Sequence, residues 1–282
     1  MSTSPRVILV TGSNAGIGYE LVHLLAAKPG NTVYLASRKE DSGREAVEKI
    51  KKEKNLDVKF VQLDITDTSS IDAAVAKITK DEGRLNVLVN NAGISEMSKP
   101  HSALQPDLSA IRNTLETNLF GLIQNTTAFL PLLRSSHKPD SAPSVILNVS
   151  TDMASNSFMA SDKSPAFLHK VIAYNTSKAA ANSYTISLAR ELKEEGIKVN
   201  AITPGFTTTK LNGYAPGGKT PEQGAQMMVD WCLLGPEGET GEFDSDLRFS
   251  ILLRVLELGI SVSVSHSRIF GRFCEYSDNH PR

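Results

Sequence analysis

The segment "TGSNAGIG", residues 11–18, decides the fold. It follows the apolar run "RVILV" and opens the amphipathic segment 16–28, which has apolar residues at 17, 21, 24 and 25. A glycine turn between a buried strand and a helix brings free helix N–H groups and the positive end of the helix dipole to a phosphate. We expect Gly12 to permit the tight turn, Gly16 to let a pyrophosphate approach and Gly18 to allow close helix–strand packing. The alternative is a glycine turn without a ligand.

Short, almost wholly apolar runs recur along the chain, as strands buried on both faces require. They occupy residues 6–12, 31–38, 57–66, 85–93, 144–151 and 197–205. Helical segments at 40–55 and 66–83 lie between them, the second with Thr66 and Asp67 as candidate caps. This alternation predicts an α/β single-domain Rossmann fold, a doubly wound parallel sheet with helices on both faces.

Composition narrows the possible partners. The net charge of −1 gives no reason to expect nucleic acid or an anionic membrane as a partner. Two distant cysteines, Cys232 and Cys274, predict a reducing, cytoplasmic location without disulfides. The six histidines lack ligand spacing, so we expect no metal. The N-terminus does not read as a signal peptide, and no apolar run has the length of a membrane span.

Four motifs carry a family resemblance. They are Gly12-x3-Gly16-x-Gly18, "NNAG" at 90–93, "YNTSK" at 174–178 and "ITPG" at 202–205. In this order they resemble the short-chain dehydrogenase/reductase family, common single-domain type, over residues 6 to about 243. The resemblance implies a nicotinamide cofactor and hydride transfer between that cofactor and a small-molecule carbonyl or alcohol substrate.

The end of the second strand indicates which cofactor binds. A site for NAD would place an acidic side chain there for the ribose 2′-hydroxyl, but Ser37 and Arg38 occupy the position. A guanidinium binds a 2′-phosphate, so Arg38 favours NADP(H), with Ser37 as a hydrogen-bond donor and Lys39 assisting. The alternative is a solvated basic loop.

The resemblance implies further cofactor contacts. They come from the first loop (Gly12, Ser13, Asn14, Gly16, Ile17, Gly18), from Asp64 and Ile65, from Asn91, Ala92 and Gly93, and from Pro204, Gly205, Thr207 and Thr209. Asn90 is expected to hold backbone groups. Residues 206–224, rich in glycine and threonine, are the expected mobile substrate lid.

Tyr174 and Lys178 are spaced i, i+4, which places them on one helix face. We expect the lysine ammonium to lower the tyrosine pKa from its usual value of about 10, so that Tyr174 exchanges a proton with the substrate oxygen. The resemblance implies that both residues also contact the cofactor and that Asn118 holds a water in the proton relay.

The stretch "NVST", 148–151, matches a family pattern whose second hydroxyl orients the carbonyl. That position is Thr151, with Ser150 as the alternative. The interval to Tyr174, 174 − 151 = 23 residues, resembles the carbonyl-reductase-like branch. We expect the extra segment, 155–172, to loop over the site, with Phe158, Met159 and Phe167 lining an apolar pocket. Its place near a subunit face favours a monomer or homodimer over a tetramer.

The leading hypothesis is therefore an NADP(H)-dependent oxidoreductase that reduces an aldehyde or ketone, reversibly. The alternative is a non-catalytic NADP-binding regulator or scaffold on the same fold. A third option, a sugar-nucleotide epimerase, usually has a differently spaced glycine loop and a larger C-terminal domain, and we expect neither in this chain.

We place the catalytic domain at 1–243 and an atypical tail, which matches no family segment, at 244–282. Truncation at about residue 245 is predicted to change activity little. Trp231, Met227 and Met228 are expected to pack in the core.

Overall fold

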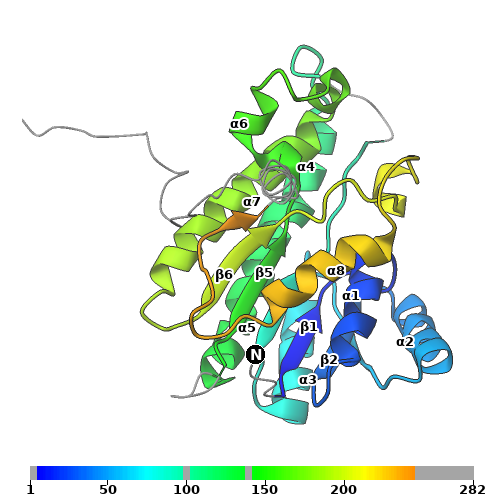
Figure 1. The fold of residues 1–282 in the computed structure, drawn as a ribbon, viewed down its shortest axis with the longest axis vertical. Helices are drawn as coiled ribbons and strands as arrows, with labels where there is room; N and C mark the ends of the chain where they lie inside the picture. The colour runs from blue at the N-terminus through cyan, green and yellow to red at the C-terminus, as the bar shows by residue number, and fades with distance from the viewer. Residues whose placement is uncertain (1–4, 98–101, 137–141, 245–282) are drawn as a thin grey trace, which may run out of the picture. The chain divides into compact units, whose positions relative to one another are not determined.

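A parallel sheet of seven strands forms the centre of the computed structural model, which describes residues 5–97, 102–136 and 142–244 (Figure 1). The strand order is β3-β2-β1-β4-β5-β6-β7, with every pair parallel. The strands are β1 (Val7–Val10), β2 (Thr32–Ser37), β3 (Lys59–Gln62), β4 (Val87–Asn90), β5 (Val145–Val149), β6 (Lys198–Ile202) and β7 (Phe243–Asp244). The order reverses beside β1, and ligands bind at such a switch point in open α/β sheets.

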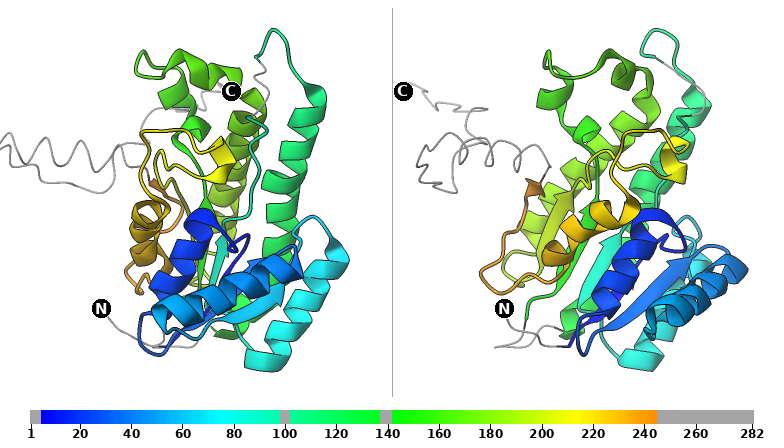
Figure 2. Two further views of the ribbon diagram at one scale, coloured as in Figure 1. Left: turned by 90° about the vertical axis from the view of Figure 1, so that its right-hand side faces the viewer. Right: turned by 45° about the vertical axis from the view of Figure 1, so that its right-hand side comes forward.

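Helices cover both faces of the sheet (Figure 2). They are α1 (Gly16–Ala26), α2 (Glu40–Lys54), α3 (Thr68–Glu82), α4 (Leu108–Leu115), η1 (Glu116–Gly121), α5 (Leu122–Ser136), α6 (Asn156–Met159), α7 (Ile172–Glu191) and α8 (Pro221–Cys232). Single turns stand at η2 (Asp152–Ala154), η3 (Ala166–Lys170) and η4 (Lys210–Asn212). The doubly wound Rossmann fold expected from the sequence is confirmed.

Strand alternation produces two separate cores. Val7 and Leu9 of β1 pack with residues of α3, α5 and α7, whereas Ile8 and Val10 pack with residues of α1, α2 and α8. Successive side chains of a strand point to opposite faces, so a sheet covered on both sides needs apolar residues at every position. This requirement explains why the strands appear in the sequence as unbroken apolar runs.

The element ends refine the sequence expectations. Of the two candidate caps of α3, Asp67 accepts from the backbone N–H of Ser69, whereas Thr66 donates to Asp64. The expected approach to a seventh strand becomes β7, and Asp244 belongs to it, accepting from Trp231 Nε1 at 3.1 Å. The sheet therefore includes one residue of the expected tail. The rest of that tail and the truncation prediction lie outside the described residues.

The buried guanidinium of Arg6 ties the start of β1 to the end of α8. It donates to the carbonyl oxygens of Cys232 at 3.1 Å and Leu234 at 2.6 Å. Carbonyls at a helix C-terminus lack intrahelical partners, so a cation there satisfies them. α8 follows the expected lid along the chain, and Arg6 thereby fixes the helix on which the lid ends. Met228 of α8 is fully buried and Trp231 packs beside the same core, as predicted.

The remaining composition-based expectations are only partly covered by the structure. His23 is buried beside Glu20 and His169 is exposed, and the other four histidines lie outside the described residues. Cys232 is a buried free thiol. Within the described ranges, no helix combines the length and the apolar character that crossing a bilayer requires.

Candidate active site

The glycine loop has the backbone shape that its sequence predicts. Gly12 and Gly16 both lie in the left-handed region, with φ of +59° and +61°. A Cβ on Gly12 would stand 2.8 Å from the Cα of Ala92, so only glycine allows the loop to approach the end of β4 this closely.

Gly18 provides room for a side chain that holds the loop. A Cβ there would lie 2.4 Å from Asn91 Nδ2. That amide donates to the carbonyl oxygens of Thr11 at 2.9 Å and Gly12 at 3.0 Å. Asn91 thus performs the backbone-holding role expected of Asn90. Asn90 instead bonds buried side chains, because as the last residue of β4 it faces the core, where Asn148 Oδ1 lies 2.8 Å away.

The N-terminus of α1 fits a phosphate group. Its N-cap residue, Ala15, has no side chain that could cap the first N–H groups, which leaves those donors for a ligand. The side chain of Ser13 is buried within the loop and bonds the carbonyl of Val10 at 2.7 Å. Its backbone N–H also bonds within the fold, donating to the carbonyl of Ala36 at 2.9 Å, so the predicted cofactor contact of Ser13 has no support from its position. This arrangement accommodates the pyrophosphate of a nicotinamide dinucleotide.

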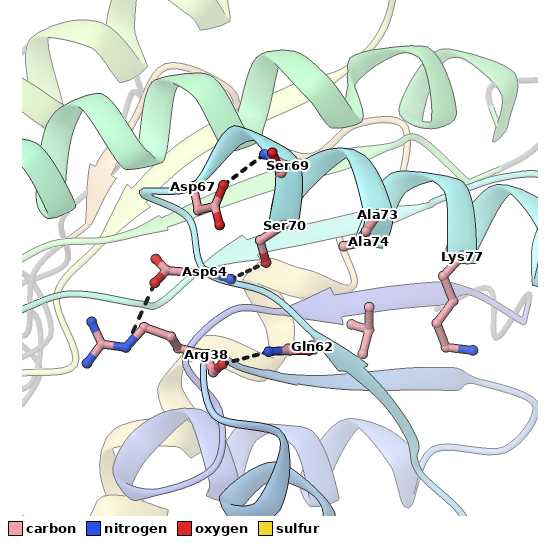
Figure 3. A pocket seen from close by; sticks show the side chains of 10 residues that line it. Arg38, Gln62, Asp64, Asp67, Ser69, Ser70, Ala73, Ala74 and Lys77 are labelled. Atoms are coloured by element: carbon pink, nitrogen blue, oxygen red, sulfur yellow. Dashed lines mark hydrogen bonds and ion pairs between the residues drawn. The ribbon is translucent and has the colours of Figure 1, made fainter.

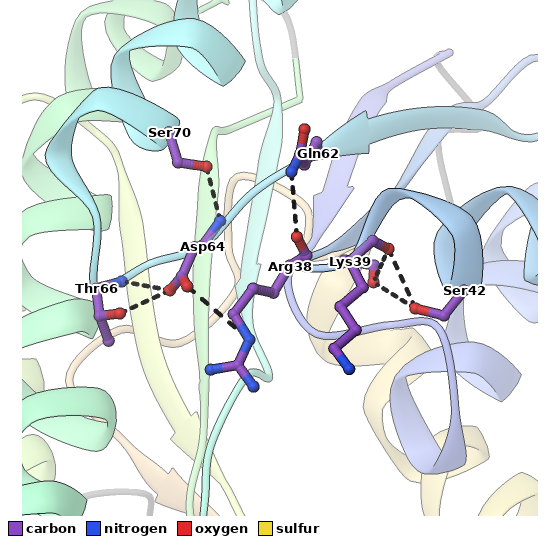
Figure 4. A network of polar contacts seen from close by, with 8 residues as sticks. Arg38, Lys39, Ser42, Gln62, Asp64, Thr66 and Ser70 are labelled. Atoms are coloured by element: carbon purple, nitrogen blue, oxygen red, sulfur yellow. Dashed lines mark hydrogen bonds and ion pairs between the residues drawn. The ribbon is translucent and has the colours of Figure 1, made fainter.

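Arg38 directly follows the carboxyl end of β2, as the sequence predicts (Figures 3 and 4). Its side chain is 72% exposed, and Nε lies 3.9 Å from Asp64 Oδ2. Asp64 is oriented by Thr66, whose N–H and hydroxyl both donate to Oδ1. Ser37 is buried and its hydroxyl donates to the carbonyl of Lys39 at 2.9 Å. Arg38, rather than Ser37, is thus the accessible donor.

An open hollow of about 470 Å³ extends from Arg38 along the edge of the sheet. Figure 3 shows Arg38 and Asp64 at one end and Lys77 of α3 at the other. Lys77 is paired with Asp81 at 2.7 Å, so the two cations of the hollow have separate carboxylate neighbours.

Tyr174 and Lys178 lie on one face of α7, as predicted, and both are buried. Lys178 Nζ donates to the carbonyl oxygen of Val149, at the end of β5, at 2.7 Å. The same ammonium stands 6.0 Å from the centroid of the Tyr174 ring. Packing α7 against β5 therefore brings the two residues to the strand end that carries Ser150 and Thr151.

The pKa of Tyr174 shifts in the direction opposite to our expectation. Burial raises the Tyr174 pKa above its usual value of 10, because a phenolate is poorly solvated there. Burial also lowers the pKa of Lys178 to about 8, so the ammonium is itself disfavoured. The sequence shows the spacing of the two groups, whereas the depth of their burial arises from the fold.

Asn118 lies in η1, a π-helical turn between α4 and α5. Its amide accepts from the N–H of Ile94 and donates to the carbonyl of Ile94 and to Ser177 Oγ, which bridges the end of β4 and α7. A Cβ on Gly93 would lie 3.1 Å from Asn118 Oδ1 and 3.6 Å from Lys178 Nζ. Asn118, Gly93 and Lys178 therefore meet at one point, although 178 − 93 = 85 residues separate the last two. Single π-turns often occur at functional sites.

The two candidate hydroxyls differ in their surroundings. Ser150 is buried and donates to Asn182 Oδ1 on α7 at 2.7 Å. Thr151 is half-buried and accepts weakly from the N–H of Met153 at 3.4 Å. Asn182 was not foreseen, although its i, i+4 spacing from Lys178 is a signal that the sequence contains.

A cleft of about 690 Å³ opens at the carboxyl ends of β5 and β6. Its lining combines strand ends, the segment before α7 and the lid. The residues are Ile17, Met97, Ser150, Thr151, Asp152, Met153, Phe158, Pro165, Phe167, Leu168, Val171, Tyr174, Thr203, Pro204, Gly205, Phe206, Thr207, Thr209, Leu211, Asn212, Ala215 and Pro216. Phe158 and Phe167 line the cleft as predicted, whereas Met159 is not among these residues. Asp152 is the one lining residue with a formal charge among those the structure describes.

The part of the expected lid that precedes α8 is residues 206–220, because α8 begins at Pro221 inside the predicted range 206–224. Thr207 and Lys219 pair through an isolated parallel β-bridge where the two ends of this segment meet. At its far side, Ser95 Oγ donates to the carbonyl of Leu211 at 2.5 Å. The sequence offered no sign of this contact, which joins segments 116 residues apart.

The chain is similar to known proteins over most of its length. Residues 6–218 match the family model described as short chain dehydrogenase. The chain is 31% identical to a (+)-neomenthol dehydrogenase of Capsicum annuum, over 86% of this chain and 96% of that protein. It is also 31% identical to carbonyl reductase [NADPH] 1 of Bos taurus, over 88% and 99%. The solved structure of salutaridine reductase from Papaver somniferum has a TM-score of 0.70 at 27% identity, covering 84% of this chain and 99% of that one.

Proposed function

Because this chain belongs to the short-chain dehydrogenase family, we propose that it is an NADP(H)-dependent oxidoreductase that reduces an aldehyde or ketone to an alcohol, reversibly. The observation that carries the proposal is the meeting of Tyr174 and Thr151 in one cleft, beside a loop whose free helix N–H groups suit a dinucleotide. The cofactor would supply the hydride.

The chain's own groups would perform the proton chemistry. Thr151 donates a hydrogen bond to the substrate carbonyl oxygen, and Tyr174 delivers the proton that this oxygen acquires. Lys178, buried beside the ring, binds the cofactor ribose and favours the phenolate that remains. Asn118 holds the end of β4 next to Lys178 and takes part in the proton relay. In the reverse direction, Tyr174 accepts the proton of the alcohol.

A non-catalytic NADP-binding regulator has no use for a buried tyrosine that lines a cleft with a buried lysine beside its ring, and this favours the enzyme. The test is a panel of aldehydes, ketones and quinones offered with NADPH and with NADH, following the loss of reduced-cofactor absorbance. Oxidation of NADPH by at least one carbonyl compound is the expected result. Tight NADPH binding without turnover of any compound would support the regulator instead.

Arg38 supports the choice of NADP(H). Its exposed guanidinium can bind a 2′-phosphate through two N–H···O hydrogen bonds at once. We expect Arg38→Ala to raise the KM for NADPH about tenfold, since a charged hydrogen-bonded contact contributes about 1.5 kcal/mol, and to leave the KM for NADH within about twofold. Lys77→Ala is the matched control, because it removes a cation from the far end of the same hollow. Equal losses with both cofactors would place Arg38 against the adenosine rather than the phosphate.

The cleft supports an apolar substrate. Aliphatic and aromatic side chains from the segment before α7 and from the lid make most of its wall, including Phe158, Phe167 and Leu211. For a series of linear 2-ketones we expect kcat/KM to rise about fourfold per methylene, the equivalent of about 0.8 kcal/mol each, until the cleft is full. A series of 2-oxo acids of equal length is the control and should react poorly. Equal kcat/KM along the ketone series would contradict this substrate class.

We also propose a cytoplasmic location, which suits the free thiol of Cys232, and a monomer or homodimer. The segment with α6 and η3 supports the smaller assembly, because it adds bulk at the N-terminal end of α7.

A further inference from the structure

The carboxyl end of β5 is fastened to α7 at two consecutive residues. The carbonyl oxygen of Val149 accepts from Lys178 Nζ at 2.7 Å. The hydroxyl of Ser150 donates to Asn182 Oδ1, also at 2.7 Å. Lys178 and Asn182 are one helical turn apart, so adjacent turns of α7 hold adjacent residues of the strand end.

Successive side chains at the end of β5 point to opposite faces of the sheet, so the hydroxyls of Ser150 and Thr151 point in different directions. Asn148 and Ser150, two residues apart, both bond side chains of α7, the first through Thr185 at 2.8 Å. Val149 belongs to the opposite core, with residues of α1 and α8. Thr151 continues in extended conformation, with φ of −155° and ψ of 152°, so its side chain is directed away from the α7 face that Ser150 occupies.

Ser150 is held in a second direction as well. Its backbone N–H donates to the carbonyl oxygen of Ile202 on β6 at 2.7 Å. The residue is 5% exposed, and its hydroxyl hydrogen is directed at Asn182. Asn182 itself is not among the residues that line the cleft. Ser150 is among them, so the hydrogen bond joins a residue of the cleft wall to one behind it, and Thr151 is the next residue along.

We propose that Ser150 and Asn182 are a positioning pair for the reaction. Their hydrogen bond fixes the end of β5 against α7, so that Thr151 presents its hydroxyl to the substrate in the cleft that Tyr174 lines. The inference rests on the proposed function, because it concerns the geometry of that proton donation. It assigns to Ser150 a role through the neighbouring Thr151 rather than a contact with the reacting atoms.

Ser150→Ala and Asn182→Leu test the pair, since each removes the bond at little cost in volume. We expect each variant to lower kcat about tenfold and to leave the KM values for NADPH and the carbonyl substrate within about twofold. The double variant should be no slower than either single variant, because the same bond is lost once. Ser183→Ala, at an exposed position of the same helix, is the control and should match the wild type.

Three other results would overturn the proposal. A loss of a thousandfold or more in Ser150→Ala beside a nearly normal Asn182→Leu would make Ser150 the hydroxyl that bonds the substrate. A lower Tm with unchanged kcat in both variants would make the bond structural only. Multiplying losses in the double variant would mean that the residues act independently. Failure of the proposed function itself would appear in the wild type, as no carbonyl turnover, before any variant is compared.

Discussion

Tyr174→Phe is expected to lower kcat about a thousandfold, within the range that positioned acid–base groups contribute. Tyr174 is buried and lines the cleft, and no other titratable hydroxyl lines it among the described residues. Removing one oxygen leaves the ring in place, so the affinity for NADPH should change less than threefold. Initial rates and a fluorescence titration with NADPH measure the two quantities separately.

Tyr184→Phe is the matched control. Tyr184 lies on the same helix but does not line the cleft, and burial raises its pKa as well. We expect this variant to turn over at the wild-type rate. If Tyr174→Phe kept the full rate, the proton would come from another group and the proposed mechanism would be wrong.

Lys178→Met is expected to lower kcat at least a hundredfold and yet to stabilise the cofactor-free protein at pH 7. Lowering the Lys178 pKa from 10.5 to about 8 corresponds to a cost of about 3 kcal/mol for keeping the ammonium buried. Methionine removes that cost but leaves the carbonyl of Val149 without its donor, a loss of about 1 to 3 kcal/mol. A small net gain, roughly 1 kcal/mol, would raise the Tm by about 2–4 °C.

The pH dependence distinguishes this explanation from better packing by methionine. The folded pKa of Lys178 lies below the unfolded one, so the destabilisation is complete below pH 8 and disappears as the pH rises to 10.5. The stability advantage of Lys178→Met should therefore shrink between pH 8 and pH 10.5. Thermal unfolding of both proteins at pH 7 and pH 10 measures the change. A variant less stable than the wild type at pH 7 would show that the bond to Val149 outweighs the buried charge.

Local sequence patterns determined the sheet, the glycine loop and the pairing of Tyr174 with Lys178 on one helix face. Glycine at positions 12 and 16 indicates backbone with positive φ, because other residues rarely adopt it. Unbroken apolar runs indicate strands buried on both faces. The i, i+4 spacing of Tyr174 and Lys178 is likewise readable, because the geometry of a helix is the same everywhere. Such inferences succeed where the cause lies within a few residues of its effect.

The tertiary structure decided the features that depend on distant segments. Ser150 faces Asn182, and Ser95 holds Leu211, only because α7 and the lid fold back onto strand ends. That Asn91 rather than Asn90 holds the backbone of the glycine loop has the same origin, since it depends on which side of β4 faces the core. The direction of the Tyr174 pKa shift was also decided by the tertiary structure, because burial causes it. Desolvation depends on everything packed around a group, and a sequence states which groups are present but not how far water is kept from them.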